Sequence, residues 1–515
     1  MKNALILISF AVALSGCKSG QESKTVSRDT PNIVYILADD LGYGDLSCYN
    51  PDGKIRTPNI DRLASAGMRF TDAHSPSSVC TPTRYALLTG QYPWRSRLPQ
   101  GVLRGYGRTL IDSATHTVGS WLQERGYRTA VIGKWHLGLD WQLRPGHEHA
   151  LEPGSYGVRE NGVVTDMDPD HIDFMRPPLN GPTTRGFDYS FILPASLDMD
   201  PYCYLENDTL TELPTAYTEG NDLNTGYTGA FWRAGKMAPS FVFEDVLPTF
   251  TEKAIAWLDK RDDAPFFLYL PLAAPHTPWV PTDEYGGKSD AGLYGDFVQM
   301  VDAEVGRILD ALDSKGLSEN TVVVFASDNG PYWRPHFIEK FNHRAAGPLK
   351  GMKADIWEGG HRVPFIVRWP GRVTPGTTSS ALTTLTNLMA TCAEIVGGNP
   401  PSTAVDSYSI VPVLQGATDN VPGQPAVIHH SSMGHFAIRQ GDWKMIEKGG
   451  SGGFSPPATV VATPDSPEGQ LYDLSKDIEE SDNLIERFPD RAAAMQTLLD
   501  SIRNISLRRD EQQSP

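Results

Sequence analysis

Cysteine and positive charge are both scarce in this sequence. The five cysteines (Cys17, Cys48, Cys80, Cys203 and Cys392) are spread over 515 residues without paired spacing, so a disulfide framework is not expected. Lysine and arginine total 45 against 62 aspartates and glutamates, which gives a formal net charge of -17. Because nucleic-acid binding needs a basic stripe and none is visible, nucleic acid is not expected as a partner. An anionic substrate would instead have to be held by a local pocket.

Long apolar runs are scarce as well. The stretch from Ala4 to Gly16 is apolar but shorter than the about 20 residues of a membrane-spanning helix, and it has the form of a signal-peptide core. Leu14-Ser15-Gly16-Cys17 resembles a bacterial lipobox, so we expect a lipoprotein signal peptide at residues 1–17 and a polar tether at residues 18–30. An ordinary cleaved signal with a chance cysteine is the alternative. The expected location is the periplasm or cell surface of a bacterium, with the membrane reached only through a lipid anchor at Cys17.

The sequence does contain a regular alternation of strand and helix patterns. Apolar runs rich in β-branched residues alternate with amphipathic stretches such as Phe297 to Lys315, which predicts an α/β fold with a large, mixed, mostly parallel sheet flanked by helices. In such sheets, ligands bind at the carboxyl ends of the strands. The predicted strands of this sheet are Asn32 to Ala38, Thr129 to Ile132, Phe266 to Leu270, Thr321 to Ala326 and Pro364 to Arg368.

The alternation weakens near residue 415, which predicts a main domain at residues 31–415 and a smaller α+β subdomain at residues 416–510. Strand patterns around Ala437 to Ile446 and Gln470 to Leu474 precede an amphipathic stretch from Asn483 to Asn504. The Gly-, Ser- and Pro-rich piece from Gly449 to Pro457 is expected to be an exposed loop.

The sharpest local signal is Cys80-Thr81-Pro82-Thr83-Arg84. Proline is tolerated in a first helical turn and Gly90 is a good helix stop, so we expect a helix with Cys80 at its N-terminus, where the helix dipole favours negative charge. Arg84 would lie one turn further along the same face. Alone the pattern is only suggestive, because a buried structural cysteine is the simpler alternative.

Four oxygen-bearing side chains follow two of the predicted strands. Asp39 and Asp40 close the first strand, and Asp328 and Asn329 close the strand that begins at Thr321. Oxygen ligands without cysteine or histidine favour calcium or magnesium over zinc, and a divalent ion would relieve the repulsion between neighbouring carboxylates. Asp-Asp and Asp-Asn-Gly are also common turn sequences, but their position at strand ends favours a metal site.

Lysines and histidines follow other strands. In Gly133-Lys134-Trp135-His136-Leu137-Gly138, an extended chain would point Lys134 and His136 to the same side, so that a cation and an acid–base group share one face. A solvated lysine beside a structural histidine is the alternative. His276 comes shortly after the strand that begins at Phe266, and Leu349-Lys350-Gly351-Met352-Lys353 supplies two further lysines.

Together these motifs resemble, in content and in order, those of the type I sulfatases, which are arylsulfatase-like members of the alkaline phosphatase superfamily. The resemblance extends over about residues 31 to 370. It implies an alkaline phosphatase-like fold, and a formylglycine (3-oxoalanine) that a formylglycine-generating maturase makes from Cys80. It also implies one calcium ion, whose expected ligands are Asp39, Asp40, Asp328, Asn329 and the modified Cys80.

The resemblance also assigns roles to the remaining side chains. Arg84, Lys134 and Lys350 are expected to offset negative charge on the nucleophile and the sulfate, while Lys353 is expected to be structural or solvent-facing. His276 would donate a proton to the departing alcohol, and His136 would accept the proton whose loss lets sulfate leave. Glu358 to Pro364 also resembles a family motif, but we expect it to form a structural turn.

The expected function is therefore hydrolysis of a sulfuric ester on a carbohydrate by a bacterial enzyme. A formylglycine-dependent phosphonate or phosphodiester hydrolase is one alternative, and a catalytically inactive glycan-binding surface protein is another. The sequence does not specify which glycan or which sulfate position is used. Four side chains near the metal and lysine motifs could line a sugar subsite, with loop packing as an equally weighted alternative: Trp333, His336, His343 and His361.

Overall fold

The computed structural model describes residues 30–98, 100–147, 166–221, 229–260, 263–461, 463 and 468–505. The expected signal peptide at residues 1–17 and nearly all of the tether at residues 18–30 lie outside these ranges, so the lipid anchor at Cys17 stays a prediction. Within the described ranges, none of the helices has the length and apolar character needed to cross a bilayer.

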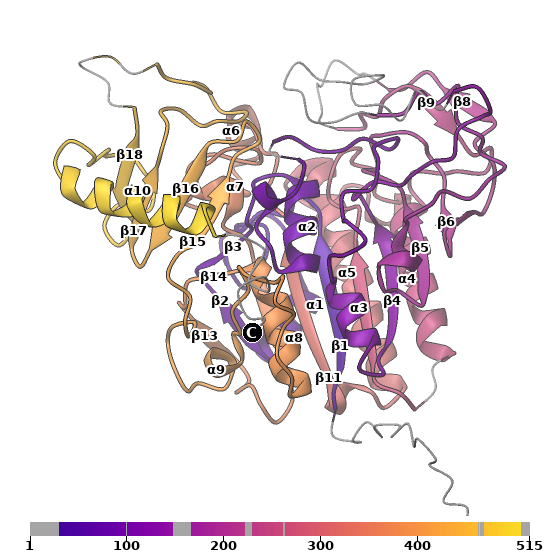
Figure 1. Ribbon diagram of the computed structural model, residues 1–515, viewed down its shortest axis with the longest axis horizontal. Helices are drawn as coiled ribbons and strands as arrows, with labels where there is room; N and C mark the ends of the chain where they lie inside the picture. The colour runs from indigo at the N-terminus through magenta and orange to yellow at the C-terminus, as the bar shows by residue number, and fades with distance from the viewer. Residues whose placement is uncertain are drawn as a thin grey trace, which may run out of the picture.

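A ten-stranded mixed sheet forms the centre of the molecule (Figure 1). Its middle strands β5, β4, β10, β1 and β11 are parallel to one another, while β12, β2, β6 and β7 introduce antiparallel pairs. All seven residues of β1 are buried, as expected for a strand with neighbours on both sides and helices on both faces. In spatial order the strands are β13 (Thr377–Ser379), β2 (Met68–Phe70), β12 (Phe365–Arg368), β11 (Thr321–Ser327), β1 (Asn32–Ala38), β10 (Phe266–Pro271), β4 (Arg128–Lys134), β5 (Tyr189–Leu193), β6 (Leu205–Glu206) and β7 (Thr209–Leu210).

The predicted α/β class is confirmed, and each predicted strand of the main sheet is present with ends that move by at most three residues. Pro364 is the one predicted strand residue that falls outside its strand. Proline has no N–H to donate, and β12 begins at Phe365, whose N–H donates to the Tyr49 hydroxyl.

Helices cover both faces of this sheet (Figure 1). On one side α5 contacts α1 and α4, and on the other α8 contacts α2 and α3. The long helix predicted from Phe297 is α5, which begins five residues earlier and presents its apolar side chains to the core. The helices of the main unit are α1 (Pro58–Ser65), α2 (Cys80–Thr89), α3 (Val118–Gln123), α4 (Val246–Asp259), α5 (Gly292–Ser314), α6 (Pro335–Phe341), α7 (Glu358–His361), α8 (Leu388–Val396) and α9 (Val411–Leu414).

Two small two-stranded sheets complete this part of the chain. One pairs β3 (Ala73–His74) with β14 (Thr383–Thr384), and the other pairs β8 (Ala216–Thr218) with β9 (Gly235–Met237).

The C-terminal residues form a separate four-stranded antiparallel sheet, drawn in light orange and yellow in Figure 1. Its strands are β15 (Val427–His430), β16 (Phe436–Gln440), β17 (Trp443–Ile446) and β18 (Gln470–Asp473), and α10 (Pro489–Arg503) packs against it through Met495, Leu499 and Ile502. A smaller α+β unit is therefore present, while its boundary at residue 416 stays a prediction.

One expectation for this unit needs correction. The Gly-rich piece from Gly449 to Pro457 is a loop, but Ser451 is buried rather than exposed. The reason is that the Asp355 carboxylate accepts hydrogen bonds from the N–H groups of Phe454 and Ser455, which draws the loop onto the main unit.

Candidate active site

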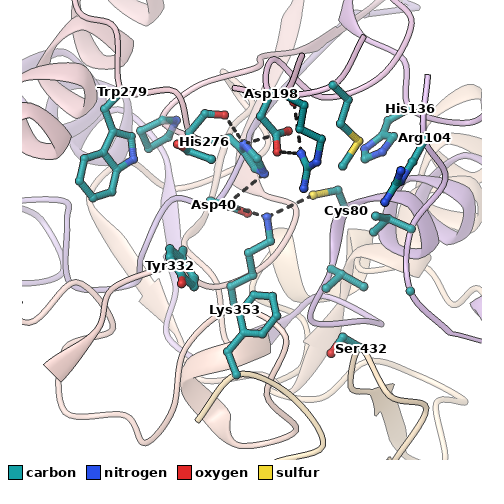
Figure 2. Close-up of a pocket in the computed structure, with 18 of the residues that line it drawn as sticks. Asp40, Cys80, Arg104, His136, Asp198, His276, Trp279, Tyr332, Lys353 and Ser432 are labelled. Atoms are coloured by element: carbon teal, nitrogen blue, oxygen red, sulfur yellow. Dashed lines mark hydrogen bonds and ion pairs between the residues drawn. The ribbon is translucent and has the colours of Figure 1, made fainter. Parts of the chain in front are cut away.

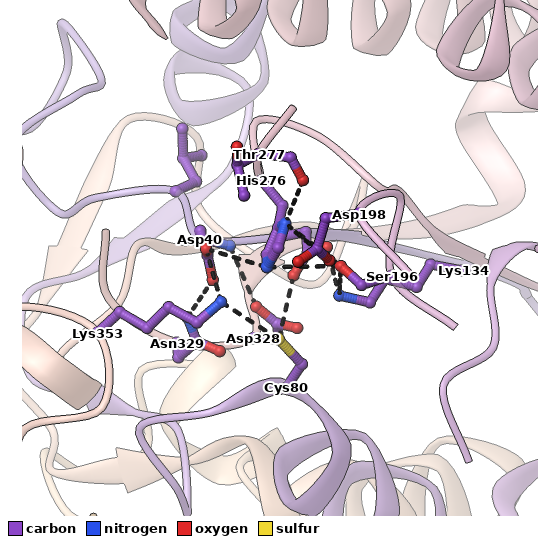
Figure 3. Close-up of polar contacts among 12 residues, drawn as sticks. Asp40, Cys80, Lys134, Ser196, Asp198, His276, Thr277, Asp328, Asn329 and Lys353 are labelled. Carbon is purple, nitrogen blue, oxygen red and sulfur yellow. Dashed lines mark hydrogen bonds and ion pairs between the residues drawn. The ribbon is translucent and has the colours of Figure 1, made fainter. Parts of the chain in front are cut away.

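Oxygen-bearing side chains meet where β1 and β11 end. The two strands are parallel and pair Ala38 with Ser327, so the residues that follow them emerge side by side. Asn329 Nδ2 donates to Asp40 Oδ1 at 2.6 Å, and the Asp40 N–H donates to Asp328 Oδ1 at 3.3 Å. The structure thus brings together the four predicted metal ligands Asp39, Asp40, Asp328 and Asn329, all of them buried. Figure 3 shows Asp40, Asp328 and Asn329 close to one another.

Cys80 is the first residue of α2, and Gly90 ends that helix in a left-handed conformation with φ of 68°, as the motif predicts. The sulfur lies 3.5 Å from Asp39 Oδ1 and 3.7 Å from Lys353 Nζ. Burial raises the pKa of the Cys80 thiol, so the unmodified side chain is un-ionised at neutral pH and a poor nucleophile.

Two buried cations face the carboxylates. Arg84 donates from Nε and Nη2 to Asp328 Oδ2, at 3.0 and 2.7 Å, and Lys134 Nζ donates to Asp39 Oδ2 at 2.6 Å. Burial opposes ionisation of Asp39, but Lys134, His276 and Arg84 outweigh it and hold the pKa of Asp39 well below its usual range. Burial and the neighbouring Asp39 raise the pKa of Asp328, which shows the carboxylate repulsion that a divalent cation would relieve.

Gly133 fixes where Lys134 points. Its φ is 139°, and a Cβ atom there would lie 1.9 Å from the Pro271 carbonyl oxygen. Only glycine permits this close approach of β4 to β10, so the chain can leave the sheet with Lys134 directed at Asp39.

Two histidines flank the carboxylates. His136 Nε2 donates to the Leu103 carbonyl at 2.8 Å, and since a carbonyl only accepts, the other nitrogen Nδ1 carries no proton and has no partner among the described residues. His276 Nδ1 donates in the same way to the Thr277 carbonyl at 2.6 Å, which leaves Nε2 3.6 Å from Asp40 Oδ2. Burial lowers the pKa of both histidines, and the nearby lysines lower it further.

Two residues of the site have a strained backbone. Asp40 has a φ of 63° and His136 has a φ of 54°, both in the left-handed region that non-glycine residues seldom adopt. Such conformations cost about 1–3 kcal/mol each and persist where surrounding contacts hold a functional side chain in position.

The prediction for the two neighbouring lysines is wrong as to which one enters the site. Lys353 Nζ donates to Asp40 Oδ2 at 2.7 Å, whereas Lys350 Nζ donates to the Glu480 carbonyl at 2.8 Å and lies 4.1 Å from the centre of the Trp357 ring. Gly351, with φ of 83°, turns the chain between them, so side chains three residues apart point in different directions. The spacing of the sequence carries no signal of this turn.

A cavity of about 400 Å³ opens above Cys80 (Figure 2). Cys80, Asp40, His136, His276 and Lys353 lie at its reacting end. Several other lining residues stand outside the sequence motifs and were missed: Arg104, Asp198, Arg233, Trp279, Tyr332, Ser432 and Phe454.

None of the four residues proposed for a sugar subsite lines this cavity. Trp333 Nε1 donates to the His343 carbonyl and His343 Nε2 contacts Asp45, so both are packing residues behind the cavity. His336 is exposed on α6, away from the lining residues. His361 belongs to a separate buried cluster. The contacts of these side chains therefore favour structural packing over a role in a sugar subsite.

That second cluster joins the two sheets. Glu358 contacts Arg362 at 2.7 Å, Arg439 at 3.1 Å and Lys444 at 3.1 Å, and Lys444 Nζ lies 3.0 Å from His361 Nε2. The rings of His74, His361 and His429 stack beside these groups. Because ammonium and guanidinium groups already fill the space between the nitrogens and carboxylates, the cluster is structural rather than a metal site.

The chemistry of the first cluster, in contrast, fits a hard cation. Asp39, Asp40 and Asp328 offer carboxylate oxygens close to one another, and Asn329 Oδ1 is buried without a hydrogen-bond partner among the described residues. These three negative charges are balanced by Arg84, Lys134 and Lys353. A divalent cation and an anionic ester group could therefore be held side by side at this cluster.

A large mixed sheet carries carboxylates, buried cations and a helix-start cysteine at one edge, an arrangement suited to the hydrolysis of an anionic ester. The comparisons with known proteins specify the family. The family described as Sulfatase matches residues 31–398. An N-acetylgalactosamine-6-O-sulfatase from Bacteroides thetaiotaomicron is 32% identical over 98% of this chain and 100% of its own length. Human arylsulfatase A is 34% identical over 88% of this chain and 83% of its own length.

A solved structure from work on glycosaminoglycan metabolism by Bacteroides thetaiotaomicron superposes with a TM-score of 0.76 and 31% identity, over 93% of this chain and 100% of that one. The chain belongs to the sulfatase family. It is an enzyme of the sulfuric ester hydrolase class.

Proposed function

We propose that this enzyme removes sulfate from a sulfated carbohydrate, with a formylglycine at position 80 and one bound calcium ion. The observation that carries the proposal is the reacting end of the cavity, where Cys80 lies between Asp39 and Lys353. The name of the bacterial relative, an N-acetylgalactosamine-6-O-sulfatase, supports a sulfated sugar as the substrate.

Asp39, Asp40, Asp328, Asn329 and residue 80 would hold the ion, because they supply clustered oxygen ligands. When present, formylglycine supplies the nucleophilic oxygen and calcium supplies positive charge. The chain's own part is to offset negative charge on residue 80 and on the sulfate: Lys353 lines the cavity, and Arg84 and Lys134 are buried behind it. All three are fixed by carboxylates before the substrate arrives, so little reorganisation is needed.

Proton transfer falls to the two histidines. His276 Nε2 faces the cavity next to Asp40, the position from which a protonated ring would donate to the departing alcohol oxygen. His136 lines the same cavity as Cys80 and presents an unprotonated Nδ1, the form required of a group that accepts a proton. The hydrogen bonds to the Leu103 and Thr277 carbonyls fix the orientation of the two rings and leave His136 Nδ1 and His276 Nε2 as the nitrogens that can exchange a proton.

The biological setting follows from the same proposal. A maturase that oxidises Cys80 would act before α2 packs, since Cys80 is 2% exposed in the folded protein. Export to the periplasm or cell surface, with a lipid at Cys17, would place the enzyme where polysaccharides are met.

The first test is mass spectrometry of the peptide containing Cys80 after coexpression with a maturase. A loss of about 18 daltons marks the change from thiol to aldehyde. Sulfate release from sulfated mono- and oligosaccharides should then require the modified residue, with the Cys80→Ala variant as the inactive control. Turnover of phosphonate monoesters without any sulfate release would assign the site to the alternative hydrolase, and binding of glycans by an unmodified, inactive protein would favour the glycan-binding alternative.

A further inference from the structure

The carboxylate of Asp198 is buried beside the reacting end, and the proposed reaction gives it no role. Asp198 lies in the loop after β5, and its side chain is 2% exposed. Its Oδ2 accepts a hydrogen bond from Arg233 Nη1, while its Oδ1 has no hydrogen-bond partner among the described residues. Figure 2 shows Asp198 pointing into the cavity next to His276.

An unbonded buried carboxylate oxygen is costly, and hydrogen bonds to charged groups contribute about 1.5–3 kcal/mol when they form. Asp198 does not obtain its missing bond from His276. Oδ1 is 4.0 Å from His276 Nδ1, too far for a hydrogen bond, and that nitrogen already donates to Thr277. No described residue supplies the missing donor, so Oδ1 is open to a donor from a ligand in the cavity.

The charges around Asp198 restrict the chemistry of this donor. A second sulfate or a uronic acid carboxylate on the same sugar would face the bare Oδ1 and be repelled. An amine would face the guanidinium of Arg233 and, nearer the reacting end, the ammonium of Lys353, which also lines the cavity. A neutral hydroxyl suits the pair, because it donates to Asp198 and can accept from Arg233.

We infer that Asp198 and Arg233 form a hydroxyl-binding subsite that holds the sulfated sugar ring itself, through one or two neutral hydroxyls close to the sulfated position. The inference rests on the proposed function and sharpens it: the sugar that loses sulfate carries free hydroxyls there rather than further sulfates. Asp198 is then a specificity-determining residue, while the groups around Cys80 bind only the sulfate.

The test compares two substrates with the maturase-treated enzyme: N-acetylgalactosamine 6-sulfate and 4-nitrophenyl sulfate, which has no hydroxyls. In the Asp198→Asn variant, kcat/KM for the sugar sulfate should fall about 10- to 100-fold more than kcat/KM for the aryl sulfate, which corresponds to one charge-assisted hydrogen bond. Asp170→Asn is the matched control, because Asp170 pairs with Lys236 at the surface and its side chain is 79% exposed. Equal losses on both substrates would overturn the inference.

Substrates altered at single hydroxyls test the same contact without relying on a variant. The 3-deoxy or the 4-deoxy analogue of the sugar sulfate should be at least 10-fold poorer than the parent for the native enzyme, and less than threefold poorer for Asp198→Asn. If both analogues match the parent in the native enzyme, the subsite is wrong.

Calorimetry on the unprocessed Cys80 protein separates this inference from the proposed function. Binding of N-acetylgalactosamine 6-sulfate that weakens at least 10-fold in Asp198→Asn supports the subsite even if no sulfate is released. Sulfate release from both test substrates with no effect of Asp198→Asn leaves the sulfatase function standing and removes the subsite. If the native protein neither binds the sugar sulfate nor turns it over, the subsite is overturned.

Discussion

Two lysine side chains that are only three residues apart occupy different positions relative to this site. Lys350 and Lys353 both stand in the lysine motif, and the resemblance assigns the sulfate to Lys350, yet only Lys353 reaches Asp40. The Cys80 motif, the aspartate pairs and the two histidines could be placed from sequence, because each follows a strand or opens a helix. Lys353 and Asp198 could not, because they stand in loops whose dihedral angles no periodic pattern specifies.

The two lysines give a matched pair of variants. Lys353→Ala removes a fixed positive charge beside Cys80 and should lower kcat/KM for a sulfate ester about 100- to 1000-fold, the range seen when one preorganised donor is removed. Lys350→Ala removes a contact with the Glu480 carbonyl and the Trp357 ring, outside the cavity, and should change kcat/KM less than threefold. Steady-state kinetics of both variants on the same ester decides the assignment, and the reverse order of effects would restore Lys350 as the binding lysine.

Loops from two different sheets meet at the mouth of the cavity. Asp355, fully buried two residues after Lys353, accepts hydrogen bonds from Met352 N–H at 2.9 Å, Phe454 N–H at 2.7 Å and Ser455 N–H at 3.0 Å. One carboxylate thus ties the segment that carries Lys353 to the loop that carries Phe454, which contributes a wall of the cavity. From its composition the sequence predicts an exposed loop here. It gives no sign of the stabilising carboxylate of Asp355, because that residue lies about 100 residues away in the chain.

Removing this carboxylate should release the loop. In Asp355→Ala, amide hydrogen exchange at residues 452–456 should rise more than tenfold, since at least two of the hydrogen bonds that hold the segment are lost. Exchange in β1, in the centre of the main sheet, should stay unchanged. Asp419→Ala is the control, because Asp419 is exposed. Unaltered exchange at 452–456 would mean that the loop holds its position without Asp355.

The stability of the main unit packed against the C-terminal sheet depends on buried histidines that stay neutral. Burial lowers the pKa values of His74, His361 and His429, and lowers the pKa of His430 to about 4. In the unfolded chain these rings take up protons near pH 6.5, while in the folded protein they do not. Their contribution to stability is thus complete above about pH 6.5 and declines as the pH falls from there toward about 4.

The melting temperature should therefore fall steeply between pH 6.5 and pH 4.5, with loss of contact between the main unit and the C-terminal sheet. His429→Phe tests the cause, because neither ring nitrogen of His429 has a partner among the described residues, so the stacked ring can be replaced without losing a hydrogen bond. The variant should show a shallower decline, by about 1.4 kcal/mol of unfolding free energy per pH unit for one fewer titrating group. A decline as steep as in the native protein would assign the acid sensitivity to other groups.

The cavity draws its parts from two sources, and this division bears on how such an enzyme changes over evolutionary time. The groups at the reacting end come from strand ends, the start of α2 and the loop of Lys353 in the main unit, whereas Ser432 and Phe454 reach the cavity from loops of the C-terminal unit. Substitutions in those loops can alter which substrate fits while the strand ends that carry the carboxylates stay in place. Related enzymes can accordingly differ in substrate specificity while they catalyse the same reaction.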